Sequence, residues 1–243
     1  MSTTDIFPRT PWETFSIAAK GDAEAREAAQ TLCERYRSPV LQYVLAIGVS
    51  PDDVEDLVHA FFVDFLQRDP FSSFDREKGL FRVFLCQCIR NFLYKQHRES
   101  VAQKRGGGAV HLSYESGVVD LEETTASSDD ETASFVFDRY WALVVLNRVF
   151  DELESQYEKR GKGEVFAQLR PLIANHEEVP LSEVADSLGM KENAVSTALH
   201  RLRKQFRHGV EAEVEGTVAD SGMVDDEIAY LKRAVARILE QQS

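Results

Sequence analysis

The sequence has few of the features that mark disulfide-stabilised or membrane-spanning proteins. Only 3 of its 243 residues are cysteine. Cys33 stands alone, and Cys86 and Cys88 share one apolar segment, which argues against a disulfide framework and fits a reducing compartment. No window approaches the roughly 18 apolar residues of a spanning helix, and the N-terminus lacks the pattern of a signal peptide. We therefore expect a cytoplasmic protein without membrane insertion.

Motifs of catalysis and cofactor binding are also lacking. There is no glycine-rich phosphate loop and no His-Glu-x-x-His zinc helix, and the glycines at 106–108 lead into a polar stretch with no strand before them. Cys86 and Cys88, two positions apart, point to different faces of a helix, so with His97 they make a poor metal site. An enzyme is an alternative that a metal assay would test, but we predict no catalytic residue, no metal and no cofactor.

Positive charge is scarce overall but locally concentrated. The net charge is -13, with seven acids and no base between residues 115 and 131, and eight acids against three bases in 211–243. By contrast, residues 82–105 carry six bases and one acid, and residues 191–208 carry five bases and one acid. Two basic segments therefore remain in an acidic protein, and a nucleic-acid partner is compatible with its composition.

No segment shows the sustained alternation of a strand, so we predict an all-α fold. Helical periodicity is expected over residues 23–47, where Pro39 should kink or split the helix. A second helix is expected after Ser50, which suits an N-cap followed by Pro51 at the first helical position. Its apolar stripe is expected to comprise Val54, Leu57, Val58, Phe61, Phe62, Phe65 and Leu66. Further helices are expected to begin at Phe81 and to cover residues 135–157, 165–173 and 225–239.

Turn-rich and acidic stretches divide the chain into four predicted parts. These are a small helical domain over 11–105, an acidic flexible linker over 106–134, a second small helical domain over 135–210, and an acidic C-terminal extension with an amphipathic helix over 211–243. We expect the extension to pack on the second domain. A sharper hypothesis is that it covers the basic segment 191–208 and lowers DNA affinity.

The second domain contains the pattern of a helix-turn-helix around Gly189, which permits a tight left-handed turn. Apolar residues at helical spacing precede it at Leu181, Val184, Ala185 and Leu188, and follow it at Val195, Leu199, Leu202 and Phe206. In this motif the second helix enters the major groove, where polar side chains meet base edges and basic ones hold phosphates. The candidate contacts are Lys191, Glu192, Asn193, Ser196, Thr197, His200, Arg201, Arg203 and Lys204.

The helix that begins at Phe81 has an apolar face and a basic, aromatic face. Aromatic rings beside Arg and Lys suit unstacked single-stranded bases. Phe74, Phe81 and Tyr94 are candidates for stacking on bases, with core packing as the alternative role of such rings.

Two blocks of sequence resemble a known family. Residues 51–66 (PDDVEDLVHAFFVDFL), 74–85 (FDREKGLFRVFL) and 89–93 (IRNFL) resemble region two of extracytoplasmic-function (ECF) sigma factors, a subfamily of the sigma-70 family. Residues 181–190 (LSEVADSLGM) and 194–203 (AVSTALHRLR) resemble their region four. Lys191 stands where the family commonly has Ser or Thr, so the usual helix cap is in doubt.

The resemblance implies a sigma factor that binds core RNA polymerase and directs promoter recognition, strand opening and transcription initiation. It implies that core polymerase is bound by Asp53, Glu55, Asp56, His59 and Asp64. It places Phe74, Lys78, Phe81, Arg82, Arg90, Asn91 and Tyr94 on the downstream promoter element, and the helix at 191–203 on the upstream element. An anti-sigma factor is a further candidate partner. The alternative function is a stand-alone helix-turn-helix regulator of duplex DNA, which would not need the 53–64 face.

Overall fold

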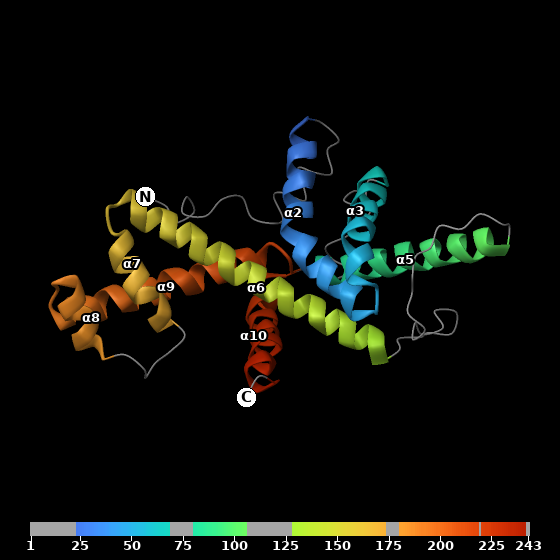
Figure 1. The fold of residues 1–243 in the computed structure, drawn as a ribbon. Helices are drawn as coiled ribbons and strands as arrows, with labels where there is room; N and C mark the ends of the chain where they lie inside the picture. Colours follow the sequence, from blue (N-terminus) through green and yellow to red (C-terminus); the bar gives the residue numbers. More distant parts are fainter. Residues whose placement is uncertain (1–22, 69–79, 106–127, 174–179, 219, 242–243) are drawn as a thin grey trace. The chain divides into compact units, whose positions relative to one another are not determined.

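The computed structural model describes residues 23–68, 80–105, 128–173, 180–218 and 220–241. Within these ranges every regular element is a helix, so the predicted all-α fold is confirmed (Figure 1). The chain divides into two compact units. The described residues that lie between 23 and 144 or between 215 and 241 belong to the first unit, and those that lie between 145 and 214 belong to the second unit.

The described residues of the first unit form five helices, of which α6 also continues into the second unit. They are α2 (Ala23–Ala46), α3 (Pro51–Gln67), α5 (Phe81–Arg105), the first half of α6 (Ser128–Lys159) and α10 (Val224–Gln241). The start of α3 follows from its local sequence, because the Ser50 hydroxyl accepts a hydrogen bond from the Asp52 N–H at 3.3 Å and Pro51 occupies the first turn. The predicted cap is thus confirmed.

Aromatic rings from three helices form the core of the first unit. The ring of Tyr36 in α2 lies 4.5 Å from that of Trp141 in α6, in a stacked arrangement, and 5.1 Å from that of Phe81 in α5. All three side chains are at most 1% exposed. Rings of this size remove large apolar areas from water, and paired rings add about 1 kcal/mol beyond burial. Residues from distant parts of the sequence therefore hold this unit together.

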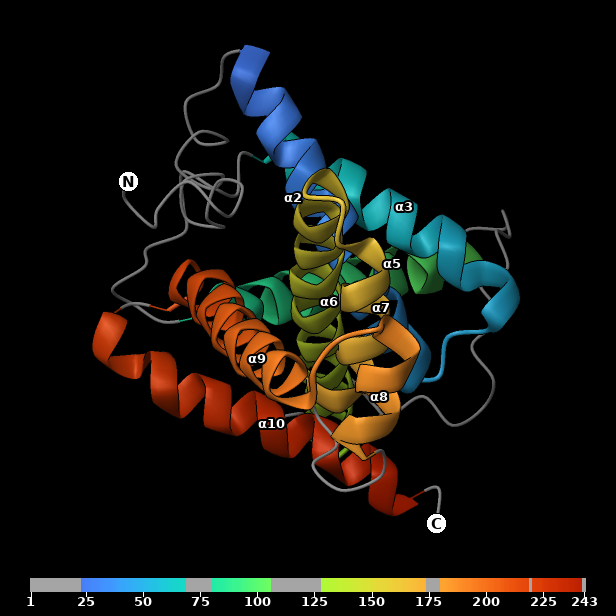
Figure 2. The same cartoon turned by 90° about the vertical axis from the view of Figure 1, so that its left-hand side faces the viewer.

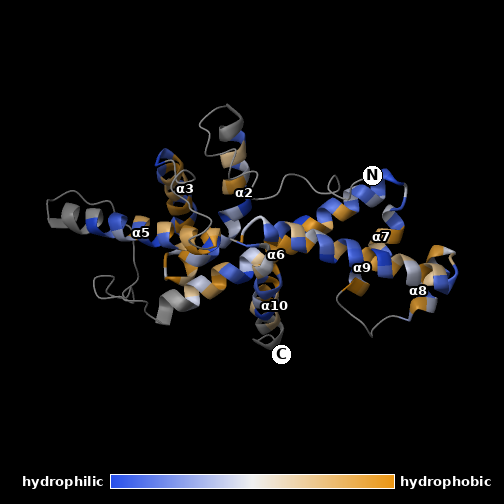
Figure 3. Cartoon of the chain, turned by 180° about the vertical axis from the view of Figure 1, so that it is seen from behind, coloured by the Kyte–Doolittle hydropathy of each residue, from blue (hydrophilic) through white to orange (hydrophobic). Residues whose placement is uncertain are grey.

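The second unit consists of the last part of α6, α7 (Gly163–Leu169), the 3-10 turn η3 (Arg170–Ile173), α8 (Leu181–Leu188) and α9 (Glu192–Glu215). Helices α7 and α8 lie side by side (Figure 2). Buried residues from each element share one hydrophobic cluster, including Leu153, Phe166, Val184 and Leu202. Hydrophobic and hydrophilic residues alternate along α9 at helical spacing, so one face enters this cluster (Figure 3).

Three details of the helices differ from the sequence predictions. Helix α2 continues through Pro39 and is not split. Helix α6 begins at Ser128, inside the predicted linker, because the acids at 129–131 favour the positive end of a helix dipole. Leu66, predicted to belong to the apolar stripe of α3, is 39% exposed. The remaining linker, residues 106–127, lies outside the described ranges.

The C-terminal extension contains the 3-10 turn η4 (Ser221–Met223) and α10, the predicted amphipathic helix. The extension was expected to pack on the predicted second domain, residues 135–210; α10 contacts Asp138 of that range but also Arg82 of the predicted first domain, and it groups with the first unit. Its buried residues are Glu227, Leu231 and Ala234. Glu227 and Tyr230 make polar contacts with α5 and α6, which the spacing of α10 alone could not indicate.

Candidate nucleic-acid interface

The turn between α8 and α9 depends on Gly189. This residue has φ 61° and ψ 29°, the left-handed conformation that the sequence predicts. Its N–H donates to the Asp186 carbonyl at 3.2 Å, and the Met190 N–H donates to the Ala185 carbonyl at 2.9 Å. No atom within 4 Å would meet an added Cβ, so the requirement for glycine comes from the backbone conformation. These bonds set the direction in which α9 leaves the turn.

Helix α9 has a buried face and a polar face. Val195, Leu199 and Leu202 are buried in the hydrophobic cluster. Nearly all of the predicted contacts are exposed on the other side, namely Lys191, Glu192, Asn193, Ser196, Thr197, His200, Arg201 and Lys204. Lys191 accepts the first helical hydrogen bonds through its carbonyl, from the N–H groups of Ala194 and Val195. A lysine side chain has no acceptor, so it provides no side-chain cap.

Arg203 is placed apart from this exposed set. Its side chain is half-buried and donates from Nη2 to the carbonyl of Leu172 at 2.7 Å. The carbonyl lies at the end of η3, where helical carbonyls lack partners within their own turn. Arg203 therefore connects α9 to η3. Its position in a basic segment predicted a DNA contact and gave no sign of this structural role.

A hollow of about 260 Å³ beside α9 adds basic residues that the sequence analysis missed. Arg160 and Lys162, which were not predicted, surround it together with the predicted Arg201, and Val165 and Met190 contribute apolar surface. The Tyr157 hydroxyl donates to the Gln205 Oε1 at 3.2 Å beside this hollow, and burial raises the pKa of the tyrosine. The sequence feature that could have indicated Arg160 and Lys162 is the short basic run at 159–162. This run contains Gly161, which has φ 67° in a turn.

Helix α5 presents a row of polar side chains at i, i+4, i+7 and i+11. Gln87, Asn91 and Arg98 are exposed, and Tyr94 is half-buried between them. The Gln87 side-chain amide donates to the Asn91 Oδ1 at 3.1 Å, and the Arg98 guanidinium lies 5.7 Å from the centre of the Tyr94 ring. An aromatic ring beside a cation is a suitable surface for single-stranded bases.

Other predicted downstream contacts lie elsewhere. Phe81 is 1% exposed and packs in the aromatic core, so its ring cannot stack on a base in this conformation. Arg90 is half-buried. Phe74 and Lys78 lie outside the described residues.

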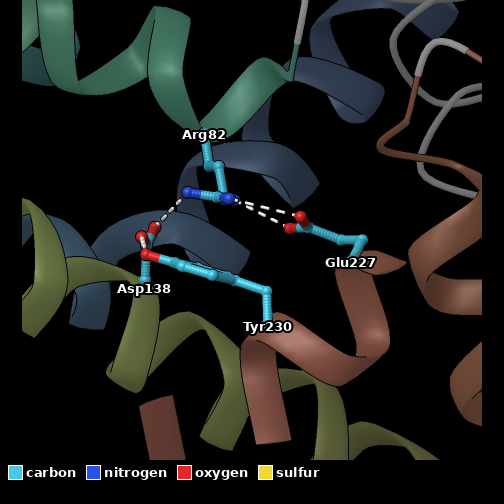
Figure 4. Close-up of polar contacts among 4 residues, drawn as sticks. All are labelled: Arg82, Asp138, Glu227 and Tyr230. Carbon is cyan, nitrogen blue, oxygen red and sulfur yellow. Dashed lines mark hydrogen bonds and ion pairs between the residues drawn. The ribbon is translucent and has the colours of Figure 1, made fainter. Parts of the chain in front are cut away.

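Arg82 takes part in a buried polar cluster, defined by Arg82, Asp138, Glu227 and Tyr230 (Figure 4). Its Nη1 donates to the Asp138 Oδ1 at 2.7 Å, while Nε and Nη2 donate to the two Glu227 oxygens at 2.8 and 3.2 Å. The Tyr230 hydroxyl donates to the Asp138 Oδ2 at 2.5 Å. The side chains of Arg82, Asp138 and Glu227 are only 11%, 6% and 8% exposed.

The pKa values of the cluster reflect this burial. Burial alone would lower the pKa of Arg82, but the hydrogen bonds and charges of Glu227 and Asp138 raise it overall. Burial raises the pKa of the Asp138 carboxyl, although the nearby Arg82 guanidinium opposes that shift. Burial and the hydrogen bond to Asp138 raise the pKa of Tyr230 to about 12. At neutral pH the phenol therefore keeps the proton that it donates.

The predicted polymerase-binding residues on α3 do not share one environment. Asp56 and His59 are exposed, on the same helical face as Val63 and Leu66, which are 44% and 39% exposed. Asp53 is half-buried. Glu55 pairs with Arg37 of α2, and Asp64 pairs with Arg68 at 2.7 Å and with Lys95 of α5 at 3.6 Å. Val63 and Leu66 were not predicted as contacts, because their exposure depends on how α2 and α5 cover the helix.

The described residues contain neither a candidate metal-binding cluster nor a candidate membrane-spanning helix. No group of three or more His, Cys, Asp or Glu side chains there is arranged to hold a metal ion. No helix in those ranges is both long and apolar enough to cross a lipid bilayer.

An exposed polar face on the second helix of a helix-turn-helix, in a chain that also carries a basic and aromatic helix, defines an all-α DNA-binding protein. The family model described as ECF sigma factor matches residues 16–212. The chain therefore belongs to the ECF sigma factor family, whose members are transcription initiation factors that regulate transcription and are not enzymes. The family implies RNA polymerase and promoter DNA as partners. No curated protein and no solved structure matched the chain.

Proposed function

We propose that this sigma factor binds core RNA polymerase through α3 and directs promoter recognition and strand opening through α5 and α9. The observation that carries the proposal is the exposed polar face of α9 after the left-handed turn at Gly189. It occurs in a chain whose ECF family match extends through both units.

In this proposal α9 reads the upstream promoter element. Asn193, Ser196 and His200 are exposed near the start of the helix and offer donors and acceptors to base edges. Arg201 and Lys204 are exposed one to two turns later and neutralise phosphates, which positions the helix without conveying sequence. Lys191, Glu192 and Thr197 complete the proposed contact face.

Helix α5 contacts the downstream, melted element in the proposal. Asn91 and Tyr94 lie on its exposed row, where a flipped base can stack and form hydrogen bonds. Phe74, Lys78 and Arg90 stay predictions for the same element. Capture of flipped bases offsets an unstacking cost of a few kcal/mol, and the polymerase supplies the metal and the chemistry.

The polymerase-binding surface proposed here is the exposed face of α3. It comprises Asp56 and His59, with Val63 and Leu66 as apolar contacts, while Asp53, Glu55 and Asp64 lie at its edges. Holding two modest DNA-binding units on one polymerase raises their effective concentration at a promoter. An anti-sigma factor stays a predicted partner.

The test is transcription from fragmented genomic DNA by core polymerase with and without this protein, followed by sequencing of transcript 5′ ends. We expect new start sites that share two spaced upstream motifs, and weaker core binding by Asp56→Arg than by the control Asp151→Arg. Asp151 is an exposed acid on α6, so its reversal matches the charge change. Footprints on duplex DNA by the protein alone, with no new starts, would instead indicate the stand-alone regulator.

A further inference from the structure

The contacts of Arg82 resemble those that an arginine makes with a phosphate. Two of its nitrogens donate to the two oxygens of Glu227, at 2.8 and 3.2 Å. A fork of parallel N–H groups binds carboxylate and phosphate groups with the same geometry. Glu227 lies in the acidic first turn of α10. The C-terminal helix therefore places an acidic side chain against the first turn of α5.

The charges of the cluster do not balance when α10 is docked. Arg82 is the one cation of the cluster, and it faces two acidic side chains, Asp138 and Glu227. Burying a charge is costly unless it is paired, and a buried ion pair gives little net stability. Asp138 alone can neutralise Arg82, through the 2.7 Å bond from Nη1. Glu227 is therefore the second anion on a cation that already has a partner; it comes from the C-terminal helix α10, whereas Asp138 comes from α6.

Tyr230 contacts both Arg82 and Asp138, so the docking of α10 depends on both of these residues. Its hydroxyl donates to Asp138 at 2.5 Å, and its ring lies 4.8 Å from the guanidinium carbon of Arg82. Glu227 and Tyr230 lie three residues apart, on the same side of α10. One face of the helix thus contacts both members of the Arg82–Asp138 pair (Figure 4).

We propose that α10 is an intramolecular competitor of nucleic acid, in which Glu227 occupies the Arg82 guanidinium until a phosphate of promoter DNA replaces it. The inference rests on the proposed function, since it takes α5 as a promoter-binding helix. It differs from the idea that the extension covers the basic segment at 191–208, because the competition occurs at the start of α5. When the phosphate binds, Glu227 and Tyr230 leave and Asp138 remains paired with Arg82.

The test compares affinities of variant holoenzymes for a fluorescent fork-junction DNA, made from a promoter located by the start-site experiment. Glu227→Gln keeps the shape of the side chain but removes its charge. We expect this variant to bind about tenfold more tightly than the wild type, within the usual range of coupling between competing sites. The control Asp226→Asn removes the same charge from an exposed neighbour and should bind like the wild type.

Two further measurements separate competition from a general loss of negative charge. In an Arg82→Ala background, Glu227→Gln should give no gain in affinity, because the shared cation is missing. Tyr230→Phe should give a smaller gain than Glu227→Gln, and hydrogen exchange of α10 in the wild type should rise when DNA binds.

Equal affinities of wild type and Glu227→Gln would overturn the proposal, and so would equal gains from Glu227→Gln and Asp226→Asn. A gain from Glu227→Gln that persists without Arg82 would also overturn it. If the holoenzyme formed but did not bind the fork-junction DNA at all, the proposed function itself would have failed.

Discussion

At the scale of single residues, Arg82 illustrates what a local pattern leaves out. Its position in a basic and aromatic helix is typical of an exposed nucleic-acid contact. The side chain is nevertheless 11% exposed, because Asp138 and Glu227, which lie 56 and 145 positions away in sequence, supply its partners. Phe81 is buried for a similar reason, since the ring of Tyr36 packs against it from α2. Contacts at such separations have no signature in helical spacing.

Removal of the Asp138 carboxylate should destabilise the first unit. Asp138→Ala takes one anion from Arg82 and the acceptor from Tyr230. Glu227 still pairs with Arg82 in this variant, so the cost is that of the hydrogen bonds that Arg82 and Tyr230 lose, about 2 kcal/mol. We expect a loss of about that size in the free energy of unfolding, measured in urea, against less than about 0.5 kcal/mol for the exposed Asp151→Ala. A loss below about 1 kcal/mol would contradict this role.

The cysteines should be almost unreactive in the folded protein. Burial raises the pKa of Cys33 to about 12, with the charge of Glu34 adding to the shift, and burial raises the pKa of Cys88 to about 11. Only the thiolate attacks a disulfide reagent, and it forms in these groups only as pH rises toward 11. At pH 8 we expect the native thiols to react with an aromatic disulfide at least about tenfold more slowly than in denaturant. Rapid labelling of one native thiol at pH 8 would show that this burial is not maintained.

At the scale of helices, elements with strong end signals could be predicted from sequence. Ser50 and Pro51 indicated the start of α3, and Gly189 indicated the end of α8. The start of α6 could not be predicted in the same way, because an acidic run suits both a solvated linker and the first turn of a helix. The exposed face of α9 followed from its apolar spacing, except at Arg203, whose partner carbonyl comes from η3.

Gly189 should tolerate no side chain without cost. Its φ of 61° is disfavoured for residues with a Cβ, by about 1 kcal/mol. We expect Gly189→Ala to lower the midpoint of thermal unfolding of the second unit and to weaken DNA binding by α9. The matched change Gly163→Ala, at the first residue of α7 where φ is not positive, should have little effect or stabilise slightly. Equal effects of the two changes would argue that the turn is not constrained.

At the scale of the whole chain, the units are not the sequential domains that composition predicted. The first unit includes described residues between 215 and 241 in addition to those between 23 and 144, so it is discontinuous in sequence. Composition and linker signals divide a chain only along its length. A returning helix such as α10 is recognisable as amphipathic, but the unit that it joins is decided by the partners of Glu227 and Tyr230.

Two core leucines allow the separateness of the units to be tested. Leu202 is 0% exposed in the second unit, and Leu85 is 1% exposed in the first. Each Leu→Ala change should cost about 2–5 kcal/mol through lost burial and a cavity. Hydrogen exchange should then accelerate in α7, α8 and α9 for Leu202→Ala, and in α2, α3 and α5 for Leu85→Ala. Acceleration across both units in each variant would mean that the protein unfolds as one cooperative body.

The stacking of Trp141 on Tyr36 has an optical consequence. Trp141 is 1% exposed and lies in α6, one turn after Asp138. The chain has 2 tryptophans, and the other is Trp12. Replacing Trp12 with phenylalanine would leave one indole, shielded from water, whose ultraviolet emission depends on its immediate surroundings. Departure of α10 from Asp138 would then change the wavelength or the intensity of that emission. Trp141 is therefore an intrinsic fluorophore that reports the movement of α10 without an added label.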